Sequence, residues 1–351
     1  MKRHFDKVKS GSSLSFVEAK NAAELILGDT LTPAEISEFL VALKTKKETS
    51  EEIEGFLAAI RATTKKFPAL EESTPATRNA LASHLVLSHP VLIDVCGTGG
   101  DGTNTFNVST GVALVLASLG IKVAKHGNRS VSSLSGSSDV LHALGIEGDT
   151  HIEGAIQSLT RKNVSFLHAP AFYSVLAKLA PIRKSIGSYT IFNALGPLLN
   201  PAPITHQLMG VYDQTLLMNA ALSIKARGVK DAFVVHGSDG LDELTLSGET
   251  HALRLHQNEI ESMTFTPEDF GLKRAKLSEV RGGNPAENAE ILLSIYGGEK
   301  SPKRDLLVLN AAAAFALVEG HVNFKTSAAK IETALDSGVT LKFVKGLRRT
   351  S

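Results

Sequence analysis

A glycine-rich segment, residues 94–107, carries the residues whose types and spacing point most directly to chemistry: Asp-Val-Cys-Gly-Thr-Gly-Gly-Asp-Gly-Thr-Asn-Thr-Phe-Asn. It overlaps the end of an apolar run, Val91–Cys96, that predicts a buried parallel strand. Ser109 and Thr110 then open an apolar segment of helical length. Glycines let a backbone approach an anion closely, and free N–H groups at a helix start point toward it. The segment therefore predicts a site for phosphate or diphosphate.

This loop differs from both common phosphate loops. A Walker loop continues with Lys and Ser or Thr after its last glycine, whereas Gly100 is followed here by Asp101 and another glycine. The spacing Gly-x-Gly-x-x-Gly is present, but Asp101 puts a carboxylate where the pyrophosphate of a dinucleotide would lie. The next predicted strand also ends in Lys125-His126 instead of an acidic residue. Dinucleotide binding is therefore disfavoured.

A second polar segment, Lys125–Arg129, follows the next predicted strand and leads into six serines between residues 130 and 138. Ligands of α/β sheets bind at the carboxyl ends of the strands. A lysine and many hydroxyl donors suit the oxygens of a second phosphate group. A serine-rich surface loop is the alternative, but the neighbouring glycine loop favours a phosphate site.

Two further groups offer complementary chemistry. Asp242 and Glu243 come shortly after the predicted strand Ala232–His236, and carboxylate oxygens are the ligands that Mg²⁺ prefers. Alone, such a pair is usually a solvated turn, and only the two upstream phosphate loops favour a metal site. Arg183 offers a guanidinium for a substrate carboxylate, although an isolated arginine is more often a surface charge.

The composition is that of a soluble enzyme. The 351 residues are 43% hydrophobic and 21% charged, with a formal net charge of +1. We therefore expect no general attraction to nucleic acid or to anionic membranes. The single Cys96 fits a reducing compartment. Residues 1–15 do not read as a signal peptide, and the longest apolar stretches are too short to span a bilayer. We expect a cytoplasmic protein.

The positions of these motifs predict an α/β fold. Capped helical segments beginning at Thr32 and Thr49 precede any strand and predict a small N-terminal helical domain. From residue 91 onward strands and helices alternate, which predicts a larger domain with a mostly parallel central sheet covered on both faces. Residues 68–90 are the expected boundary, and Leu306–Val318 is expected to be a buried helix. The predicted strands are Val91–Cys96, Ile121–Ala124, Val164–Leu167, His206–Tyr212 and Ala232–His236, with Thr250–Leu255 as an edge strand.

Taken together, these segments resemble the anthranilate phosphoribosyltransferases, enzymes of tryptophan biosynthesis. The resemblance runs over nearly the whole chain, with several long motifs in the right order. The motifs are Gly97–Asp101 with Asn107–Thr110, Lys125–Arg129, Phe192–Pro201, Gly240–Glu243, Thr266–Gly271 and Gly282–Pro285. The resemblance implies the nucleoside phosphorylase/phosphoribosyltransferase class II fold. It also implies a helical domain of residues 1–75 joined by 172–190, an α/β domain of residues 76–351, and a homodimer formed through the helical domains.

The resemblance further implies transfer of the 5-phosphoribosyl group from phosphoribosyl diphosphate to the amine of anthranilate, with Mg²⁺ as cofactor. No side chain is assigned as a general acid or base, so catalysis is expected from positioning and electrostatics. The implied donor-binding residues are Gly97, Thr98, Gly100, Asp101, Thr105, Asn107, Ser109, Thr110, Lys125 and Ser137. The implied anthranilate-binding residues are Gly97, His126, Asn128, Arg183 and Pro197, and the implied metal ligands are Ser109, Asp242 and Glu243.

One position departs from the family pattern, and two other functions stay open. This chain has Tyr173-Ser174 where the family commonly has His-Pro, which leaves the acceptor preference uncertain but not the phosphoribosyl transfer. A pyrimidine nucleoside phosphorylase is the first alternative, which the diphosphate-type loop and Asp242-Glu243 disfavour. A non-catalytic, nucleic-acid-binding relative is the second, which the near-neutral charge disfavours.

Overall fold

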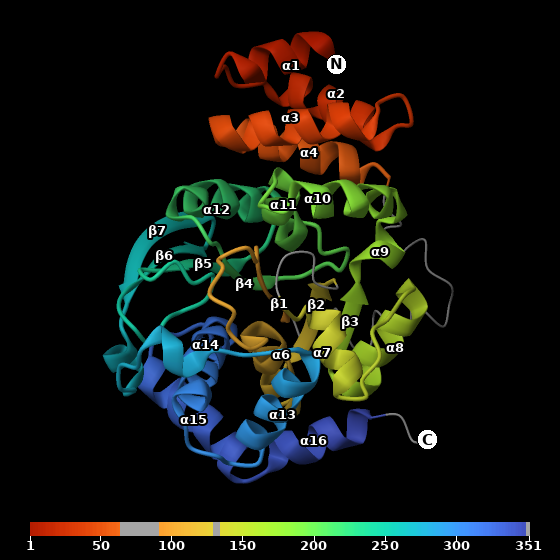
Figure 1. The fold of residues 1–351 in the computed structure, drawn as a ribbon. Helices are drawn as coiled ribbons and strands as arrows, with labels where there is room; N and C mark the ends of the chain where they lie inside the picture. Colours follow the sequence, from red (N-terminus) through yellow and green to blue (C-terminus); the bar gives the residue numbers. More distant parts are fainter. Residues whose placement is uncertain (64–90, 129–133, 349–351) are drawn as a thin grey trace.

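Four helices form the N-terminal part of the protein. The structure is a computed structural model that describes residues 1–63, 91–128 and 134–348 (Figure 1). The four helices are α1 (Lys2–Lys9), α2 (Phe16–Leu27), α3 (Pro33–Lys46) and α4 (Ser50–Arg61). Thr32 and Thr49 begin α3 and α4 with capping boxes, in which each threonine and the glutamate three residues later bond to the other's backbone N–H. The two capped helices are therefore confirmed, whereas the predicted boundary at 68–90 lies outside the described residues.

A seven-stranded sheet forms the centre of the larger part, with the order β3-β2-β1-β4-β5-β6-β7. The first five strands in that order are parallel, and β6 and β7 are antiparallel. The strands are β1 (Leu92–Gly97), β2 (Lys122–Gly127), β3 (Val164–His168), β4 (His206–Gly210), β5 (Asp231–Gly237), β6 (Thr250–His256) and β7 (Glu259–Phe265). The mostly parallel sheet predicted from the sequence is confirmed.

Two details of the predicted sheet are wrong. Thr250–Leu255 was expected at the edge, but β6 lies between β5 and a seventh strand, β7, that we did not predict. Charged and polar residues interrupt β7, whose side chains are mostly exposed. Its hairpin turn uses Gln257 and Asn258 at φ 48° and 67° in place of the usual Asn-Gly signal. Strand β2 also continues beyond Ala124 to Gly127, so that Lys125 and His126 lie within it.

Helices cover both faces of the sheet. Those that follow β1, β2 and β3 are α6 (Val108–Ser118), α7 (Ser137–Ala143), α8 (Ile152–Lys162), α9 (Ala169–Phe172), η3 (Ser174–Leu179), α10 (Ala180–Ile186) and α11 (Ile191–Leu198). The later ones are η4 (Gln214–Leu216), α12 (Leu217–Ala226), η5 (Pro267–Phe270), η6 (Leu277–Val280), α13 (Pro285–Tyr296), α14 (Pro302–Glu319), α15 (Phe324–Asp336) and α16 (Val339–Leu347). Helix α14 contains the predicted helix Leu306–Val318, and most of its residues are buried, as expected.

The alternation of side chains along the strands divides the apolar core in two. On one face, Cys96 and Ala124 pack with α10 to α12 and the four N-terminal helices, and we call this the bundle-side core. On the other face, Val95 and Val123 pack with α6 and with α13 to α16, and we call this the α14-side core. Figure 1 shows α10, α11 and α12 between the N-terminal helices and the sheet. Each strand therefore carries side chains to two separate environments.

The segment 172–190 contacts the N-terminal helices. Helix α10 packs against α3, and Lys178 Nζ lies 2.5 Å from the Gly28 carbonyl and 3.1 Å from the Asp29 carboxylate. The exact domain limits stay a prediction. In the described part of the chain, no single helix is long and apolar enough to cross a membrane. Only α14 and α15 together, with a 115° bend between them, meet that criterion by length and composition.

Candidate active site

The predicted site residues lie where four parallel strands end. Strands β1, β2, β4 and β5 end in Gly97, Gly127, Gly210 and Gly237, and the strand order reverses between β1 and β4, which is where ligands bind in such sheets. A Cβ on Gly97 would lie 2.4 Å from a carboxylate oxygen of Asp242, and one on Gly210 would lie 1.6 Å from the Asp242 carbonyl oxygen. The turn that carries Asp242 is therefore packed directly against two strand ends.

The first glycine loop is anchored by the buried Thr98 and exposes the two glycines that follow it. Thr98 is buried, and its hydroxyl accepts the Tyr212 N–H at 3.1 Å. Gly99 and Gly100 are exposed and have φ values of 63° and 82°, a backbone conformation that favours glycine. The Gly99 N–H donates to Asp242 Oδ2 at 2.6 Å. The loop thus joins β1 to the acidic turn and leaves its glycines open to a ligand.

The helix start beyond the loop has polar groups that suit an anion. Asn107 is the N-cap residue of α6, and Thr105 forms an isolated backbone bridge with Arg281. The Thr110 hydroxyl is buried without a hydrogen-bond partner among the described residues. The Ser109 hydroxyl accepts from Lys125 Nζ at 3.1 Å. A buried hydroxyl without a partner is costly, so a bound ligand or water is the natural partner for Thr110.

Lys125 and His126 are neighbours in β2 but face opposite sides of the sheet. Lys125 is 3% exposed, and its Nζ donates to the Val95 carbonyl at 2.6 Å as well as to Ser109. His126 Nδ1 lies 3.2 Å from the carbonyl of Gly196 in α11. Because strand side chains alternate, Lys125 joins the glycine loop and α6, whereas His126 joins α11 on the bundle side.

The paired carboxylates are buried. Asp242 and Glu243 are 9% and 7% exposed in the turn after β5. Burial raises the pKa of Asp242, and the charge of Asp101 raises it further. Burial and the charge of Asp242 raise the pKa of Glu243, against the lowering effects of Lys125 and the Ser109 backbone N–H. We call residues 97–110, Lys125 and residues 242–243 the donor region.

This carboxylate group fits a divalent cation. Burial is the largest cause of the raised pKa values of these two carboxyl groups, and repulsion between neighbouring carboxylates is the next. A bound cation would offset both effects. Hard oxygen ligands of this kind suit Mg²⁺, which often bridges protein carboxylates to substrate phosphates. The Ser109 backbone N–H bonds to Glu243, which places this serine beside the carboxylates. Asp242, Glu243 and Ser109 are therefore the candidate metal ligands.

On the bundle side of the sheet, His126 is buried among packed side chains. Burial lowers the pKa of His126 to about 4, and its Nε2 has no hydrogen-bond partner in the described part of the chain. The Tyr173 ring meets the imidazole edge-on with centroids 5.8 Å apart, and its hydroxyl donates to the Leu199 carbonyl. Gln207 Nε2 donates to the Pro197 carbonyl at 2.9 Å. The end of α11 is thus fixed against β2 and β4.

Arg183 reaches the same face from α10. Its Nη2 donates to Asn193 Oδ1 at 3.1 Å, and its guanidinium lies 5.9 Å from the ring centre of Phe192. Burial lowers the pKa of Arg183, and its Nε has no partner within the described residues. Asn193 Nδ2 comes within 3.8 Å of a Cβ built on Gly100 and so links Arg183 to the glycine loop. We call His126, Tyr173, Arg183 and residues 191–200 the acceptor region.

The second polar loop is described only in part. Arg129 and the serines at 130, 132 and 133 lie outside the described residues. The Asn128 carbonyl accepts from the Ser137 hydroxyl at 3.1 Å and from the Ser138 N–H at 3.2 Å. A Cβ on Gly127 would lie 2.2 Å from Ser137 Oγ, so the start of α7 packs tightly on the end of β2. Ser137 therefore lies beside the strand end that carries Lys125.

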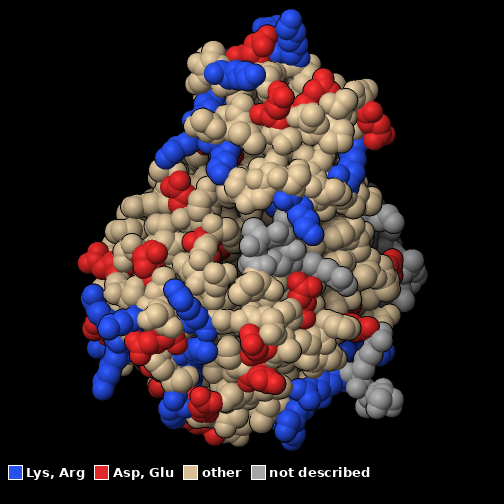
Figure 2. Space-filling view, viewed as in Figure 1, with Lys and Arg blue, Asp and Glu red and all other residues tan. Residues whose placement is uncertain are grey.

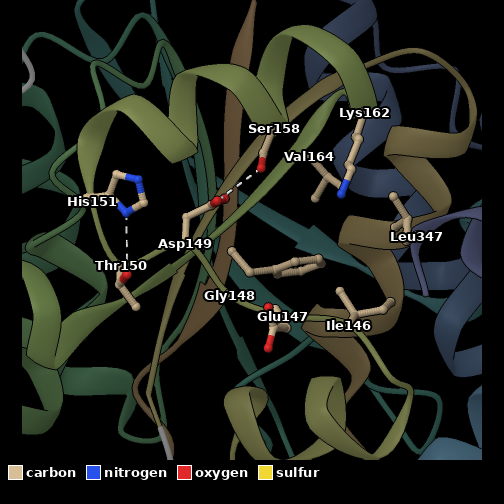
Figure 3. A pocket seen from close by; sticks show the side chains of 11 residues that line it. Ile146, Glu147, Gly148, Asp149, Thr150, His151, Ser158, Lys162, Val164 and Leu347 are labelled. Carbon is tan, nitrogen blue, oxygen red and sulfur yellow. Dashed lines mark hydrogen bonds between the residues drawn. The ribbon is translucent and has the colours of Figure 1, made fainter. Parts of the chain in front are cut away.

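Two cavities differ in their relation to this site. One, of about 420 Å³, borders the donor region and is lined by Asp101, Gly102, Thr103, Asn104, Leu134, Leu277, Arg281 and Gly282. The other, of about 310 Å³, lies between β3, α8 and the end of α16 and contains none of the predicted site residues (Figure 3). There Asp149 accepts a hydrogen bond from Ser158 at 3.0 Å. On the face shown in Figure 2, basic and acidic side chains are interspersed.

Sequence reasoning missed several residues that hold the site. Gln207, Gly210, Tyr212 and Asn288 received no role, and Asn193 was noted only within a longer motif. Gly210 and Tyr212 lie in the last three residues of the predicted strand His206–Tyr212, whereas the observed β4 ends at Gly210. A glycine near a strand end was the signal for Gly210. The motif Gly282–Pro285 pointed toward Asn288. Gln207 gave no signal beyond being an amide within an apolar strand.

Comparison with known proteins agrees with the geometry. Residues 89–341 match the glycosyl transferase family, a/b domain, and residues 2–64 match its helical bundle domain. The chain is 42% identical to the anthranilate phosphoribosyltransferase of Moorella thermoacetica, covering 96% of this chain and 94% of that one. It is 43% identical to that of Methanosarcina mazei, covering 98% and 88%. The fold and the site thus define a glycosyl transferase with a helical bundle and an α/β domain.

Solved structures agree with these relatives. The Thermus thermophilus enzyme superposes with a TM-score of 0.83 at 32% identity, covering 98% of each chain. The Saccharomyces cerevisiae enzyme in complex with PRPP (phosphoribosyl diphosphate) and Mg gives 0.84 at 29% identity, covering 99% and 96%. This chain belongs to the anthranilate phosphoribosyltransferase family. The family resemblance, the fold class and the enzymatic nature predicted from the sequence are confirmed, and the two alternative functions are set aside.

Proposed function

We propose that this enzyme of tryptophan biosynthesis transfers the 5-phosphoribosyl group of PRPP to the amine of anthranilate, with Mg²⁺ as cofactor. The observation that carries the proposal is the end of β2, where Lys125 faces the donor region and His126 the acceptor region. Adjacent residues of one strand thus join the two halves of the site. The yeast relatives solved with PRPP and Mg and with 4-fluoroanthranilate support both substrate classes.

The donor region is built for the charge that develops as the C1–O bond breaks. The electron pair of that bond goes to the diphosphate, so negative charge grows on the leaving group and positive charge on the ribose C1. Lys125 and the exposed backbone at Gly100 would face this leaving group. Asn107, Ser109 and Thr110 would face it from the helix start. Because Lys125 is buried, its charge acts in a poorly screened environment. Mg²⁺ bound through Asp242 and Glu243 would neutralise diphosphate charge.

The acceptor region orients a weak nucleophile. The arylamine forms the new C1–N bond and loses a proton, so alignment matters more than a strong base. Arg183, held by Asn193, pairs with the anthranilate carboxylate. A carbonyl only accepts, so His126 Nδ1 carries the proton toward Gly196 and Nε2 keeps its lone pair for a substrate N–H. Asn128 and Pro197 complete the surroundings of the ring.

The homodimer and the cytoplasmic location belong to the same proposal. Phe16, Val17 and Val41 are large apolar side chains that stay exposed on α2 and α3, and a second copy of the chain covering this surface would remove them from water. The single cysteine supports a reducing compartment. Light scattering coupled to gel filtration tests the dimer, since a particle of one chain mass at micromolar concentration would contradict it.

The decisive experiment follows the fluorescence of anthranilate with PRPP and Mg²⁺. We expect the signal to fall only when enzyme, PRPP and metal are all present. A second assay with thymidine and inorganic phosphate separates transfer from phosphorolysis. Phosphorolysis without any loss of anthranilate would overturn the proposal.

The assignment of Arg183 has its own test. Replacing Arg183 by Ala should raise the KM for anthranilate by about tenfold or more, because a charge-assisted pair is lost, and leave the KM for PRPP nearly unchanged. Lys184→Ala is a matched control, since Lys184 is the exposed next residue of α10. Equal increases in both KM values for Arg183→Ala would defeat the assignment.

A further inference from the structure

The motif Gly282–Pro285 has no role among the implied binding residues, but it leads into the buried amide of Asn288 beside the donor region. Asn288, in the first turns of α13, is 1% exposed. Its Oδ1 accepts the Gly283 N–H at 2.7 Å, and its Nδ2 donates to Asn107 Oδ1 at 3.0 Å. A Cβ on Gly282 would lie 2.6 Å from Asn288 Oδ1 and 2.5 Å from the Phe106 nitrogen. The motif is therefore packed tightly around this amide and the start of α6.

These contacts fix the orientation of two amides in series. A backbone N–H only donates, so the Asn288 atom that faces Gly283 must be the oxygen. The other end of that amide is then its NH₂ group, so the Asn107 atom opposite must also be an oxygen. Asn107 is thereby fixed with its own NH₂ group turned the other way. The Asn107 amide, whose oxygen and nitrogen could otherwise exchange places by a rotation of the side chain, therefore has one orientation.

The Asn107 amide has one hydrogen left for a ligand. Its Oδ1 also accepts from the Ser135 hydroxyl at 3.0 Å, and its Nδ2 donates to the Ser135 carbonyl at 3.1 Å. With the Asn288 contact, both oxygen lone pairs and one N–H are used within the described residues. No described residue takes the second N–H, which belongs to the N-cap residue of α6, at the end of a helix where anions bind. Ser135 belongs to the second polar segment, so the network also ties the two predicted phosphate loops together.

We propose that Asn288 is a positioning residue for the diphosphate of PRPP, acting by fixing Asn107 and coupling the two loops. This inference rests on the proposed function. Asn288 does not touch the substrate: it sets the direction of the N–H that does.

Steady-state kinetics test the inference. Asn288→Ala should raise the KM for PRPP about tenfold, the factor for one misdirected hydrogen bond to a charged group, with the KM for anthranilate changed less than about twofold. Asn288→Asp keeps the acceptor for Gly283 but sets a carboxylate oxygen against Asn107 Oδ1, so its effect should be at least as large. In the Asn107→Ala background, Asn288→Ala should add less than about twofold, because residues acting through one contact are not additive.

Asn284→Ala is the matched control. Asn284 caps the same helix by accepting the Ala286 and Glu287 N–H groups. Among the described residues it is not part of the hydrogen-bond network of Asn107. We expect its loss to lower the Tm to a similar extent as Asn288→Ala and to leave the KM for PRPP unchanged. An increase in that KM for Asn284→Ala matching the one for Asn288→Ala would reduce Asn288 to a structural role and overturn the inference.

A second measurement separates this inference from the proposed function. The increase in Tm that inorganic diphosphate with Mg²⁺ produces reads binding without turnover. Wild-type protein that is stabilised by diphosphate but does not consume anthranilate would refute the acceptor assignment alone. Asn288→Ala should then still lose more than half of the stabilisation. Full stabilisation in this variant would refute the role of Asn288, whatever the wild-type turnover.

Discussion

The donor and acceptor regions occupy opposite faces of the same strand ends and are built in different ways. The donor region relies on glycine backbone, a buried lysine and two buried carboxylates. The acceptor region relies on neutral or apolar side chains, with His126 kept uncharged by burial and Tyr173 fixed to Leu199. The highly charged diphosphate would thus bind to charged side chains and backbone amides. The flat anthranilate would bind to a packed surface with Arg183 as its one cation. The two environments lie on opposite faces of the strands and meet at the carboxyl ends of the strands, where Asn193 comes within 3.8 Å of a Cβ built on Gly100.

Disturbing the backbone of the donor region should have the largest effect. Gly210→Ala places a Cβ 1.6 Å from the Asp242 carbonyl oxygen, so the turn that carries both carboxylates must move. We expect kcat/KM to fall by roughly a hundredfold or more, because a misplacement of about 1 Å has that effect. Gly346→Ala in α16 is the control, since nothing lies within 4 Å of the added carbon. Near-normal activity of Gly210→Ala would show that the turn need not be held there.

Removing one donor carboxylate should come next. Asp242→Asn keeps a side-chain oxygen for the Gly99 N–H but removes a charge. We expect the Mg²⁺ concentration for half-maximal rate to rise about tenfold or more, in line with losses at metal sites. The KM for anthranilate should stay nearly constant if the regions are separate. Chelation with EDTA should abolish the wild-type rate, and activity that survives chelation would contradict a role for the metal.

The pH dependence of stability tests the acceptor region. The pKa of His126 is lowered to about 4 in the folded protein, whereas an unfolded histidine titrates near 6.5. The unfolded state therefore binds the extra proton between those values, and His126 destabilises the fold as the pH falls from about 6.5 to about 4. The full effect is on the order of 3 kcal/mol.

Urea unfolding of the wild type and of His126→Gln at pH 7 and pH 5 measures how much His126 contributes to the loss of stability. The difference between the two proteins removes groups common to both, such as Glu48, whose raised pKa acts in the opposite direction. An equal loss of stability in the two proteins would mean that His126 is protonated in the folded state.

A matched pair of tyrosines should give the smallest effect. Tyr173→Phe and Tyr296→Phe each remove one buried hydroxyl that donates to a carbonyl, of Leu199 on the bundle side and of Gly111 on the α14 side. Each should lower the free energy of unfolding by about 1 kcal/mol. Only Tyr173→Phe should alter the KM for anthranilate. A change in that KM for both variants would mean that the two faces are coupled.

Local chemistry explains what could be predicted from the sequence. Capping boxes, the glycine loop and apolar runs depend on neighbouring residues, and these features placed α3, α4, β1 and α6 within a residue or two. Lys125 and Asp242 could be associated with phosphate and metal because strand ends gather at one edge of a parallel sheet. The family resemblance added Arg183, an arginine whose local sequence is that of an ordinary surface helix.

What could not be predicted depends on contacts between distant residues. Asn288 and Asn107 are 181 positions apart. Each lies in or near a family motif, but neither motif shows that the two amides pair. The contact of Gly210 with Asp242 likewise requires the register of β4 beside β1. Strand β7 was missed because its outer face is exposed and polar, so the alternation that marks a half-buried strand is weak.

The buried position of Cys96 makes its thiol a natural probe of how often the central sheet opens. The thiol lies in β1 on the bundle side, accepts from Gln207 Nε2 at 3.3 Å, and its pKa is raised by burial. It is the only thiol in the chain, so the rate at which a thiol reagent labels the native enzyme counts openings of the central sheet and nothing else. Substrates that stabilise the closed molecule should lower the rate at which the reagent labels Cys96, and no engineered probe is needed to see this.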